Sequence, residues 1–330
     1  MKNFARQYIK YQYSKEAGWD CTGNIGDCIQ NIAVEELYKK AGISPDKLIN
    51  INRDSLPTYN GPQTRLVMQG WFADAHGCFP FPWSDKIEPV FLGFHVNKMN
   101  NTRERFVRDN VLRQMKAYEP IGCRDRNTRD FLKMFGLDAY FSGCMTLTFD
   151  TRKKTPRNGK IFIVDLQPKS LERLPNKIRK KGDFSITHLY KFDKYPITEK
   201  AAKKFEDDAR NILKRYKEEA KMVITSRIHV AMPCIAMGIP VVFICDHPSD
   251  ERFDVLRGII PVYRYRDIKY VNWKPGKVNI NKLKNAIINN AIAQIKQEKV
   301  YWPRKKLEKI TSELKPIRYL PWYKTLFKKQ

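Results

Sequence analysis

The sequence lacks both the cysteine spacings of a structural metal site and the long apolar run of a membrane span. Its seven cysteines are scattered, and none forms a CxxC or CxxH pair, so a structural zinc site is not expected. No stretch approaches about 18 uninterrupted apolar residues, and the opening MKNFARQYIKYQYSK contains no apolar core of a signal peptide. These absences favour reduced thiols and a location on the cytoplasmic side of the membrane.

Acidic residues are scarce relative to basic ones. The chain has 330 residues, in which 35 Asp and Glu stand against 62 Lys and Arg, giving a formal net charge of +27. Such an excess favours an anionic partner, namely a phosphorylated substrate, an acidic lipid surface or nucleic acid, although lysine-rich surfaces also arise without a function. Aromatic residues make up 12% of the chain, which excludes disorder throughout, and the length suits two domains.

Apolar runs alternate with amphipathic segments along the chain. Strands are expected at residues 65–72, 88–97, 121–125, 139–149, 160–166, 221–226 and 240–245, and helices at 26–42, 102–120, 127–136, 201–220 and 227–238. The strand, helix and strand within residues 221–245 form a βαβ unit, which implies a parallel sheet. The polar segment 151–159, TRKKTPRNG, is expected to link two domains.

Ser226, Arg227 and His229 lie where a buried strand turns into a helix. In open parallel sheets, ligands bind beyond the carboxyl ends of the strands, and the free N–H groups of a helix N-terminus attract anions. Ser226 can cap the helix and donate a hydrogen bond. Arg227 offers a planar fork for phosphate or carboxylate, and His229 can exchange protons near neutral pH. The alternative is a structural His229 beside a surface Arg227.

The segment TGNIGDCIQN, residues 22–31, places two glycines at the start of another helix. Gly23 and Gly26 flank Asn24 and allow a ligand to approach the backbone closely. Asp27 can orient a sugar hydroxyl or act as a base. The pattern matches neither the dinucleotide fingerprint nor the P-loop, and the alternative is that Asp27 only caps the helix between glycine turns.

Three further segments carry candidate residues. Arg124 follows a strand and precedes a helix, so it is placed to bind a second anionic group; the alternative is a surface pair with Asp125. Ser142 belongs to a small, polar segment that suits either the wall of a cleft or a turn at a sheet edge. The segment QGWF, residues 69–72, is expected either to pack in the core or to stack on a sugar. No cluster of carboxylates and histidines suggests a metal site.

Taken together, five segments resemble the polysaccharide pyruvyl transferase family, in the family's order and over roughly residues 18–250. They are GNIGDCIQNIA, QGWF with EPVFLGFHVN, IGCRDRNTRDFLKMFG, SGCMTLTF and SRIHVAMPCIAMGIPVVFI. Arg227 and His229 match the family's SR-hydrophobic-H motif, Arg124 matches its RD arginine, and residues 23–27 match its GNxGD loop. The resemblance implies an α/β protein with two Rossmann-like domains whose parallel sheets face a cleft, as in the GT-B glycosyltransferases.

The resemblance also implies an activity: a transferase that moves a pyruvyl group from phosphoenolpyruvate to a sugar of a glycan as a ketal, in polysaccharide biosynthesis and without a cofactor. The acceptor is expected to be a glycan or a lipid-linked sugar. The expected catalytic residues are His229, Arg227 and Asp27, and the expected substrate-binding residues are Arg124, Ser226, Gly23, Asn24, Gly26 and Ser142.

The expected domains are residues 1–150 on the acceptor side and residues 151–290 on the donor side. A basic, aromatic tail at 291–330 is expected either to pack back on the first domain or to rest on an anionic membrane surface. The location is therefore expected to be cytoplasmic, with peripheral membrane contact through this tail. The alternatives are a GT-B glycosyltransferase that uses a nucleotide sugar and a non-catalytic basic binding protein. Nucleic acid is not expected as the partner, because no motif that reads DNA or RNA occurs.

Overall fold

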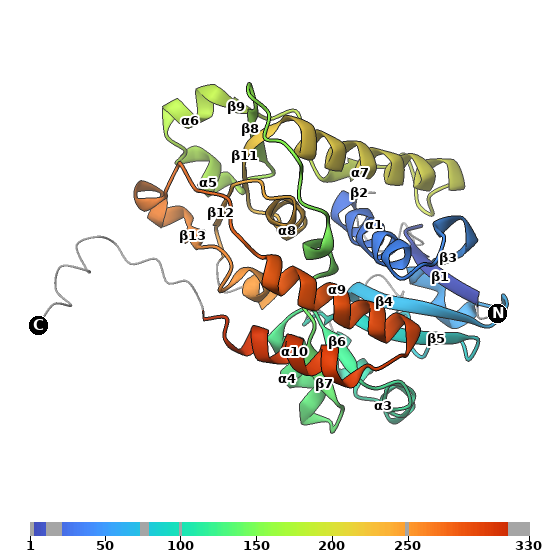
Figure 1. Ribbon diagram of the computed structural model, residues 1–330. Coiled ribbons are helices and arrows are strands. Elements are labelled where there is room, and N and C mark those ends of the chain that lie inside the picture. The colour runs from blue at the N-terminus through green and yellow to red at the C-terminus, as the bar shows by residue number, and fades with distance from the viewer. Residues whose placement is uncertain (1–2, 11–21, 73–78, 99–100, 248–250, 316–330) are drawn as a thin grey trace, which may run out of the picture.

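The computed structural model describes residues 3–10, 22–72, 79–98, 101–247 and 251–315, which form two parallel sheets and one short antiparallel pair (Figure 1). The first sheet has the strand order β3-β1-β4-β5-β6-β7: Leu48–Asn52, Asn3–Tyr8, Thr64–Phe72, Ile87–Val96, Ile121–Cys123 and Ala139–Phe141. The second has the order β13-β12-β11-β8-β9: Val262–Arg264, Val241–Cys245, Ala220–Thr225, Lys160–Val164 and Gly182–Asp183. The antiparallel pair joins β2 (Thr22–Asn24) to β10 (Leu189–Lys191). The predicted α/β class with parallel sheets is confirmed.

Side chains alternate between the two faces along each strand, and in both large sheets the two faces are packed against other elements. In β4, Val67 belongs to the central hydrophobic cluster, whereas Leu66 packs in a cluster on the other face of the first sheet. In β12, Phe243 belongs to the same central cluster, whereas Val242 packs on the other face of the second sheet. One central core is therefore shared by the two sheets, and each sheet has a further core on its outer face.

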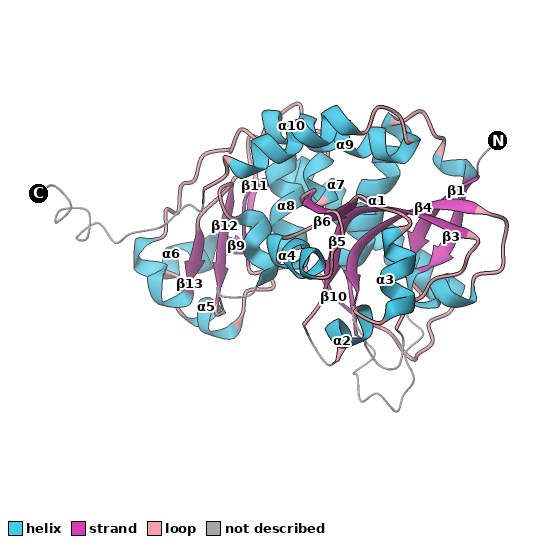
Figure 2. Ribbon diagram, turned by 90° about the horizontal axis from the view of Figure 1, so that it is seen from below, coloured by secondary structure: helices cyan, strands magenta, loops and turns pink. Residues whose placement is uncertain are grey.

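Helices fill the space between and around the sheets, and Figure 2 separates the two sheets, with β9, β11, β12 and β13 on one side and β1, β3 and β4 on the other. The helices that contribute to the central core are α1 (Ile25–Lys40), α7 (Glu199–Glu219), α8 (Ile228–Ala236), α9 (Asn281–Lys296) and α10 (Tyr301–Ser312). The helices that pack on the outer face of the first sheet are α2 (Thr102–Phe106), α3 (Asp109–Lys116) and α4 (Arg126–Met134). Those beside the outer face of the second sheet are α5 (Pro168–Glu172) and α6 (Asn176–Lys181).

The prediction of one continuous helix over residues 102–120 is wrong, because this segment forms two helices, α2 and α3. Arg108 is extended (φ −67°, ψ 140°) and separates α2 from α3. On one straight helix, Phe106 and Met115 would lie nine residues, about two and a half turns, apart and would therefore face opposite sides. The break allows both to pack in the same outer cluster. The segment 139–149 is likewise strand only over β7, after which Met145–Thr148 forms a 3₁₀ turn.

The last two described helices return to the first sheet, as Figure 1 shows in orange and red. Buried Arg65 on β4 donates to the carbonyl of Ile295 at the end of α9 over 2.8 Å. Arg304 on α10 makes two hydrogen bonds of 2.6 Å to the carboxylate of Asp138, just before β7. The predicted boundary between residues 290 and 291 falls inside α9, and residues 316–330 of the predicted tail lie outside the described residues.

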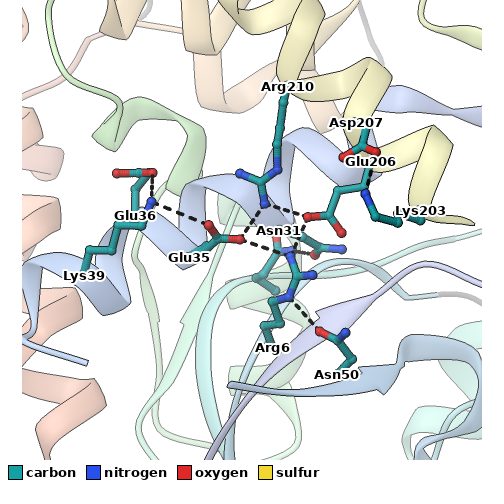
Figure 3. A network of polar contacts seen from close by, with 11 residues as sticks. Arg6, Asn31, Glu35, Glu36, Lys39, Asn50, Lys203, Glu206, Asp207 and Arg210 are labelled. Atoms are coloured by element: carbon teal, nitrogen blue, oxygen red, sulfur yellow. Dashed lines mark hydrogen bonds and ion pairs between the residues drawn. The ribbon is translucent and has the colours of Figure 1, made fainter. Parts of the chain in front are cut away.

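A cluster of four charged side chains ties α1 to both halves of the chain (Figure 3). Glu35 on α1 accepts hydrogen bonds from Arg6 of β1 (3.1 Å) and from Arg210 of α7 (2.6 Å). Glu206, also on α7, contacts the same two guanidinium groups, each at 2.6 Å. The charges of two cations and two carboxylates thus balance where the first sheet lies close to α7.

The described cysteines, Cys28, Cys123, Cys144, Cys234 and Cys245, are free and buried. No helix within the described ranges is long and apolar enough to cross a bilayer.

Candidate active site

A cavity of about 500 Å³ opens at the carboxyl ends of strands from both large sheets. The lining residues from the first half of the chain are Thr22, Asn24, Asp27, Arg53, Trp71 and Arg124; those from the second half are Asp165, Gln167, His188, Ser226, Arg227, Ile228, His229, His247, Arg252 and Phe253. This placement follows the general rule for open parallel sheets, since β6, β8, β11 and β12 all end near it. The cavity brings together four arginines and three histidines with two carboxylates.

The loop before α1 shapes one wall of the cavity. The predicted cap, Asp27, is replaced by Asn24, whose side chain accepts a hydrogen bond from the N–H of Gly26 (3.0 Å), so the helix begins at Ile25. Asp27 lies in the first helical turn, lines the cavity and forms a 3.3 Å ion pair with buried Arg53. The Asp27 carboxylate therefore faces the cavity beside a cation.

Gly26 is required by the packing of this loop against α8. A Cβ atom at residue 26 would lie 2.8 Å from the Cβ and 2.8 Å from the Nδ1 of His229, closer than side-chain atoms normally approach. Gly23 lies on β2 opposite Tyr190. Neither glycine belongs to the lining residues, so Gly26 acts by admitting the imidazole.

Arg227 is the N-cap residue of α8, a position that the sequence suggested for Ser226. Its Nε lies 3.1 Å from Oδ2 of Asp165, at the end of β8. The Asp165 backbone has a φ of 45°, a left-handed conformation that is strained for a residue other than glycine. The Asp165 carboxylate also accepts hydrogen bonds from the Thr187 hydroxyl (2.7 Å) and the His188 backbone N–H (2.9 Å). Arg227 is therefore held in one direction by a well-anchored carboxylate.

The Ser226 hydroxyl lines the cavity but is occupied by the protein itself. It accepts a hydrogen bond from the backbone N–H of Gln167 (3.2 Å) and donates to the carbonyl of Ile244 (2.6 Å). Ser142 lies outside the cavity wall; its hydroxyl accepts from Gly93 N–H (2.9 Å) and donates to the Cys123 carbonyl (3.1 Å). The expected substrate contact of Ser142 thus does not fit its position, and both serines join neighbouring strands.

Arg124 is the most deeply buried cation of the site, with 2% of its surface exposed. Among the described residues, its side chain makes one hydrogen bond, a 3.4 Å contact to the side-chain oxygen of Gln30, and its Nε has no partner. Within the described part of the chain it forms no ion pair with a carboxylate. Burial lowers the pKa of Arg124. A buried guanidinium with no carboxylate in direct contact is costly, so the arrangement fits a bound anion.

The alternative of a surface pair between Arg124 and Asp125 is wrong. Asp125 is fully buried and caps α4 by accepting a 2.8 Å hydrogen bond from Thr128 N–H. Its other oxygen lies 2.5 Å from Nδ1 of buried His95. Burial alone would raise the pKa of Asp125, but the hydrogen bond to His95 and the charge of Arg124 lower it overall. Asp125 therefore fixes the turn that presents Arg124.

His229 is the second residue of α8 and lines the cavity with its ring partly buried. Its Nε2 is shielded from solvent and has no hydrogen-bond partner among the described residues. Loss of hydration, followed by the charge of Arg124, lowers the pKa of His229 well below its ordinary value. The imidazole is therefore neutral at neutral pH and has a ring nitrogen available for a ligand.

Several cavity residues were not found from the sequence. Arg53 and Arg252 belong to charged stretches with no distinctive spacing, and His188 and His247 stand in loops without a motif. Trp71 was left open between packing and sugar stacking; it lines the cavity and packs partly against the central core. No group of three or more His, Cys, Asp and Glu side chains that could hold a metal occurs in the part of the chain described.

Comparison with known proteins gives one family match. The family model described as polysaccharide pyruvyl transferase matches residues 24–245, and no curated protein matches the chain. Among solved structures, the chain is similar to a functionally uncharacterized protein from Klebsiella pneumoniae at 14% identity, covering 76% of this chain and 88% of that one with a TM-score of 0.45. It is also similar to a protein proposed to be a UDP-N-acetylglucosamine 2-epimerase from Listeria monocytogenes, at 13% identity, covering 100% and 98% with a TM-score of 0.37.

Proposed function

The chain belongs to the polysaccharide pyruvyl transferase family, and from this premise we propose that it transfers a pyruvyl group from phosphoenolpyruvate to two hydroxyls of a glycan sugar, forming a cyclic ketal. The observation that carries the proposal is buried Arg124, which lines the cavity together with Arg227 and His229 and has no carboxylate counterion in the described chain. Phosphoenolpyruvate bears a phosphate and a carboxylate, so it needs two cationic contacts.

The donor is placed between the two halves of the cavity. Arg124 contacts one anionic group, and Arg227 with the N-terminal amides of α8 contacts the other. Trp71, Arg53 and Asp27, which come from the first half, form the acceptor side. This division corresponds to two Rossmann-like domains, one of residues 1–150 and one that begins at residue 151, which face the cavity in the GT-B manner.

His229 transfers the proton that the reaction needs. Binding of the anionic donor offsets the charge of Arg124 and raises the pKa of the imidazole, which takes up a proton and delivers it to C3 of the enol. The first sugar hydroxyl then adds to C2, and its proton returns to His229. The C2–O bond to phosphate breaks, the second hydroxyl adds to C2, and its proton leaves with the phosphate. Asp27, beside Arg53, orients the acceptor hydroxyls.

The arginines stabilise the charge that moves through these steps. Positive side chains around a shielded cavity act on developing phosphate charge more strongly than in water. A well-placed acid/base contributes about 10²- to 10⁴-fold to the rate, so the arginine contacts account for much of the remainder. The proposal requires no cofactor beyond the donor substrate.

The first experiment is incubation with phosphoenolpyruvate and a panel of glycans, both free and lipid-linked. We expect inorganic phosphate to be released only with an accepted glycan, and mass spectrometry to find the product increased by the mass of a pyruvate ketal. Parallel reactions contain nucleotide sugars in place of phosphoenolpyruvate. Release of nucleotide together with sugar transfer, and no release of phosphate, would replace the proposal by glycosyl transfer.

We further propose that the protein works in the cytoplasm at an anionic membrane surface, where lipid-linked acceptors are found. On α10, Trp302 is 75% exposed and Tyr301 is 59% exposed. Lys306 and Lys309 are exposed four and seven residues after Trp302, which places all three on one face of the helix. Aromatic rings beside lysines are typical of helices that lie on anionic lipid.

Vesicle sedimentation tests this surface. Vesicles with a large fraction of phosphatidylglycerol should sediment the protein several times better than pure phosphatidylcholine vesicles, and added salt should weaken this binding. The double variant Trp302→Ala, Lys306→Ala should lose most of the difference, whereas Lys203→Ala, at an exposed position of α7, should retain it. Equal sedimentation of the double variant and the parent protein would rule out α10 as the membrane contact.

A further inference from the structure

The cavity contains a second histidine that has no role in the proposed reaction. His188 is fully buried and precedes β10. Its backbone N–H donates to Asp165 (2.9 Å), and its carbonyl accepts from the N–H of Ile25, the first residue of α1, over 2.9 Å. The residue is thus fixed between the carboxylate that anchors Arg227 and the start of α1.

The two ring nitrogens of His188 have different surroundings. Nε2 lies 2.9 Å from the hydroxyl of Tyr216 on α7, and Tyr216 does not line the cavity. Nδ1 is buried and has no hydrogen-bond partner among the described residues, although the residue itself lines the cavity. Nε2 is therefore turned toward Tyr216, and Nδ1 is the ring nitrogen that has no partner in the described chain.

The buried hydroxyl of Tyr216 decides which nitrogen carries the proton. Within the described chain, Nε2 of His188 is the one hydrogen-bond partner of this hydroxyl. Burial raises the pKa of Tyr216 well above its ordinary value, so the hydroxyl keeps its proton. If Nε2 carried the imidazole proton, both the phenol proton and the lone pair of Nδ1 would be buried without partners, whereas the other tautomer leaves only the Nδ1 proton, which a bound anion can accept. With the phenol donating to Nε2, the imidazole proton resides on Nδ1.

We propose that His188 is a neutral hydrogen-bond donor to the anionic substrate, held by Tyr216 in the tautomer whose proton lies on Nδ1. Tyr216 is accordingly a positioning residue. Only the identity of the anion, phosphoenolpyruvate, depends on the proposed function. The tautomer and the binding of a simple anion depend on the geometry alone.

Burial keeps the His188 ring neutral. Burial lowers its pKa to about 3, with Asp165 opposing the shift and Arg227 adding to it. His229 on α8 belongs to the same cavity, and the charge of one imidazole lowers the pKa of the other. Since the pKa in the folded protein is depressed, the ring stays uncharged throughout the range above about pH 5. A neutral N–H donor polarises an anion without giving up its proton, so His188 and His229 have separate tasks.

Nitrogen-15 spectra of protein labelled at histidine measure the tautomer directly. Between pH 6 and pH 9 we expect the His188 ring to show the Nδ1–H pattern with no titration. Tyr216→Phe removes the hydroxyl but keeps the ring, and should shift His188 toward the Nε2–H tautomer. An Nε2–H pattern in the parent protein, or no change of tautomer in Tyr216→Phe, would overturn the proposal.

Anion affinity gives the second measurement, with inorganic phosphate and phosphoenolpyruvate as separate probes in calorimetry. His188→Ala should weaken binding of phosphoenolpyruvate by about 10- to 100-fold, as expected for one hydrogen bond to a charged group. His188→Asn places an amide N–H near the position of Nδ1 and should restore affinity to within severalfold of the parent protein. Unchanged affinity in His188→Ala, or equal losses in both variants, contradicts a donor at Nδ1.

The two proposals can fail separately. If the Nδ1–H tautomer is found and inorganic phosphate binding responds to His188→Ala, but no glycan releases phosphate from phosphoenolpyruvate, the function fails and the donor assignment stands. Each variant is first checked by thermal unfolding. Should His188→Ala not fold, the tautomer in the parent protein and the His188→Asn affinity decide the question.

Discussion

His229→Asn is expected to reduce turnover of phosphoenolpyruvate by at least about 10²- to 10⁴-fold, the usual contribution of a positioned acid/base, and to change donor affinity only severalfold. The amide has nearly the same size as the ring, so the space left free by Gly26 remains filled. It cannot, however, accept and return a proton near neutral pH. Steady-state kinetics combined with donor titration separates the two effects.

The pH dependence gives a second signature of His229. In the free protein, the lowered pKa of the imidazole leaves it neutral at and above pH 6.5, so kcat/KM should show no acidic limb from this group in that range. Donor binding raises the pKa, so kcat should fall as pH rises through the new value. Calorimetry in buffers of different ionisation enthalpy should detect proton uptake on donor binding. No proton uptake, together with turnover retained in His229→Asn, would exclude His229 from the proton transfer.

Arg124→Met is expected to change binding and stability in opposite directions. Loss of a charged fork that contacts an anion should weaken phosphoenolpyruvate binding by about 100-fold or more, since each charge-assisted hydrogen bond contributes about 1.5–3 kcal/mol. The free energy of unfolding without ligand should rise by about 1–3 kcal/mol. The reason is that Met fills a similar volume and removes a buried cation that has no carboxylate partner in the described chain. Donor titration and denaturant unfolding measure the two quantities.

A matched control is available in Arg65, which is also almost fully buried (3% exposed) but forms an ion pair with a carboxylate. It donates to the Ile295 carbonyl (2.8 Å), to Glu88 (2.6 Å) and to Gln297 (2.7 Å). Arg65→Met should therefore destabilise the protein by about 3–5 kcal/mol without altering donor affinity, since Arg65 lies outside the cavity wall. If both variants change the free energy of unfolding in the same direction and by a similar amount, the proposal of an anion site at Arg124 is wrong.

The sequence predicts β4, β5, β8, β11 and β12 and the helices α1, α7 and α8, because each carries its own periodicity, whereas β1, β3 and α9 were not predicted. The runs before Ser226 and before Arg124 read as strands, and both residues follow strands in the structure. The break at Arg108 was missed because local amphipathicity does not reveal which faces the rest of the core will cover. The cap at Asn24 was missed because Asp27 is an equally good capping type three residues later.

The candidate site was predictable only where a side chain belongs to a strand-to-helix turn. Arg124, Arg227 and His229 were found in this way, and all three line the cavity. His188 was not, because its position depends on a β2–β10 pairing between segments more than 160 residues apart. The hydrogen bonds of the Ser226 and Ser142 hydroxyls could not be predicted either, since their partners lie on or next to neighbouring strands.

The position of α1 limits how the two halves can be recombined. This helix follows directly from the loop beside His229, contributes to the core shared by both sheets, and carries Glu35 into the charged cluster with Arg6 and Arg210. A chimera that exchanges one half between relatives would set a foreign α1 against unmatched helices. Compatible exchanges would have to carry α1 and its facing surface on α7 together, so these positions should change in concert as such proteins diverge.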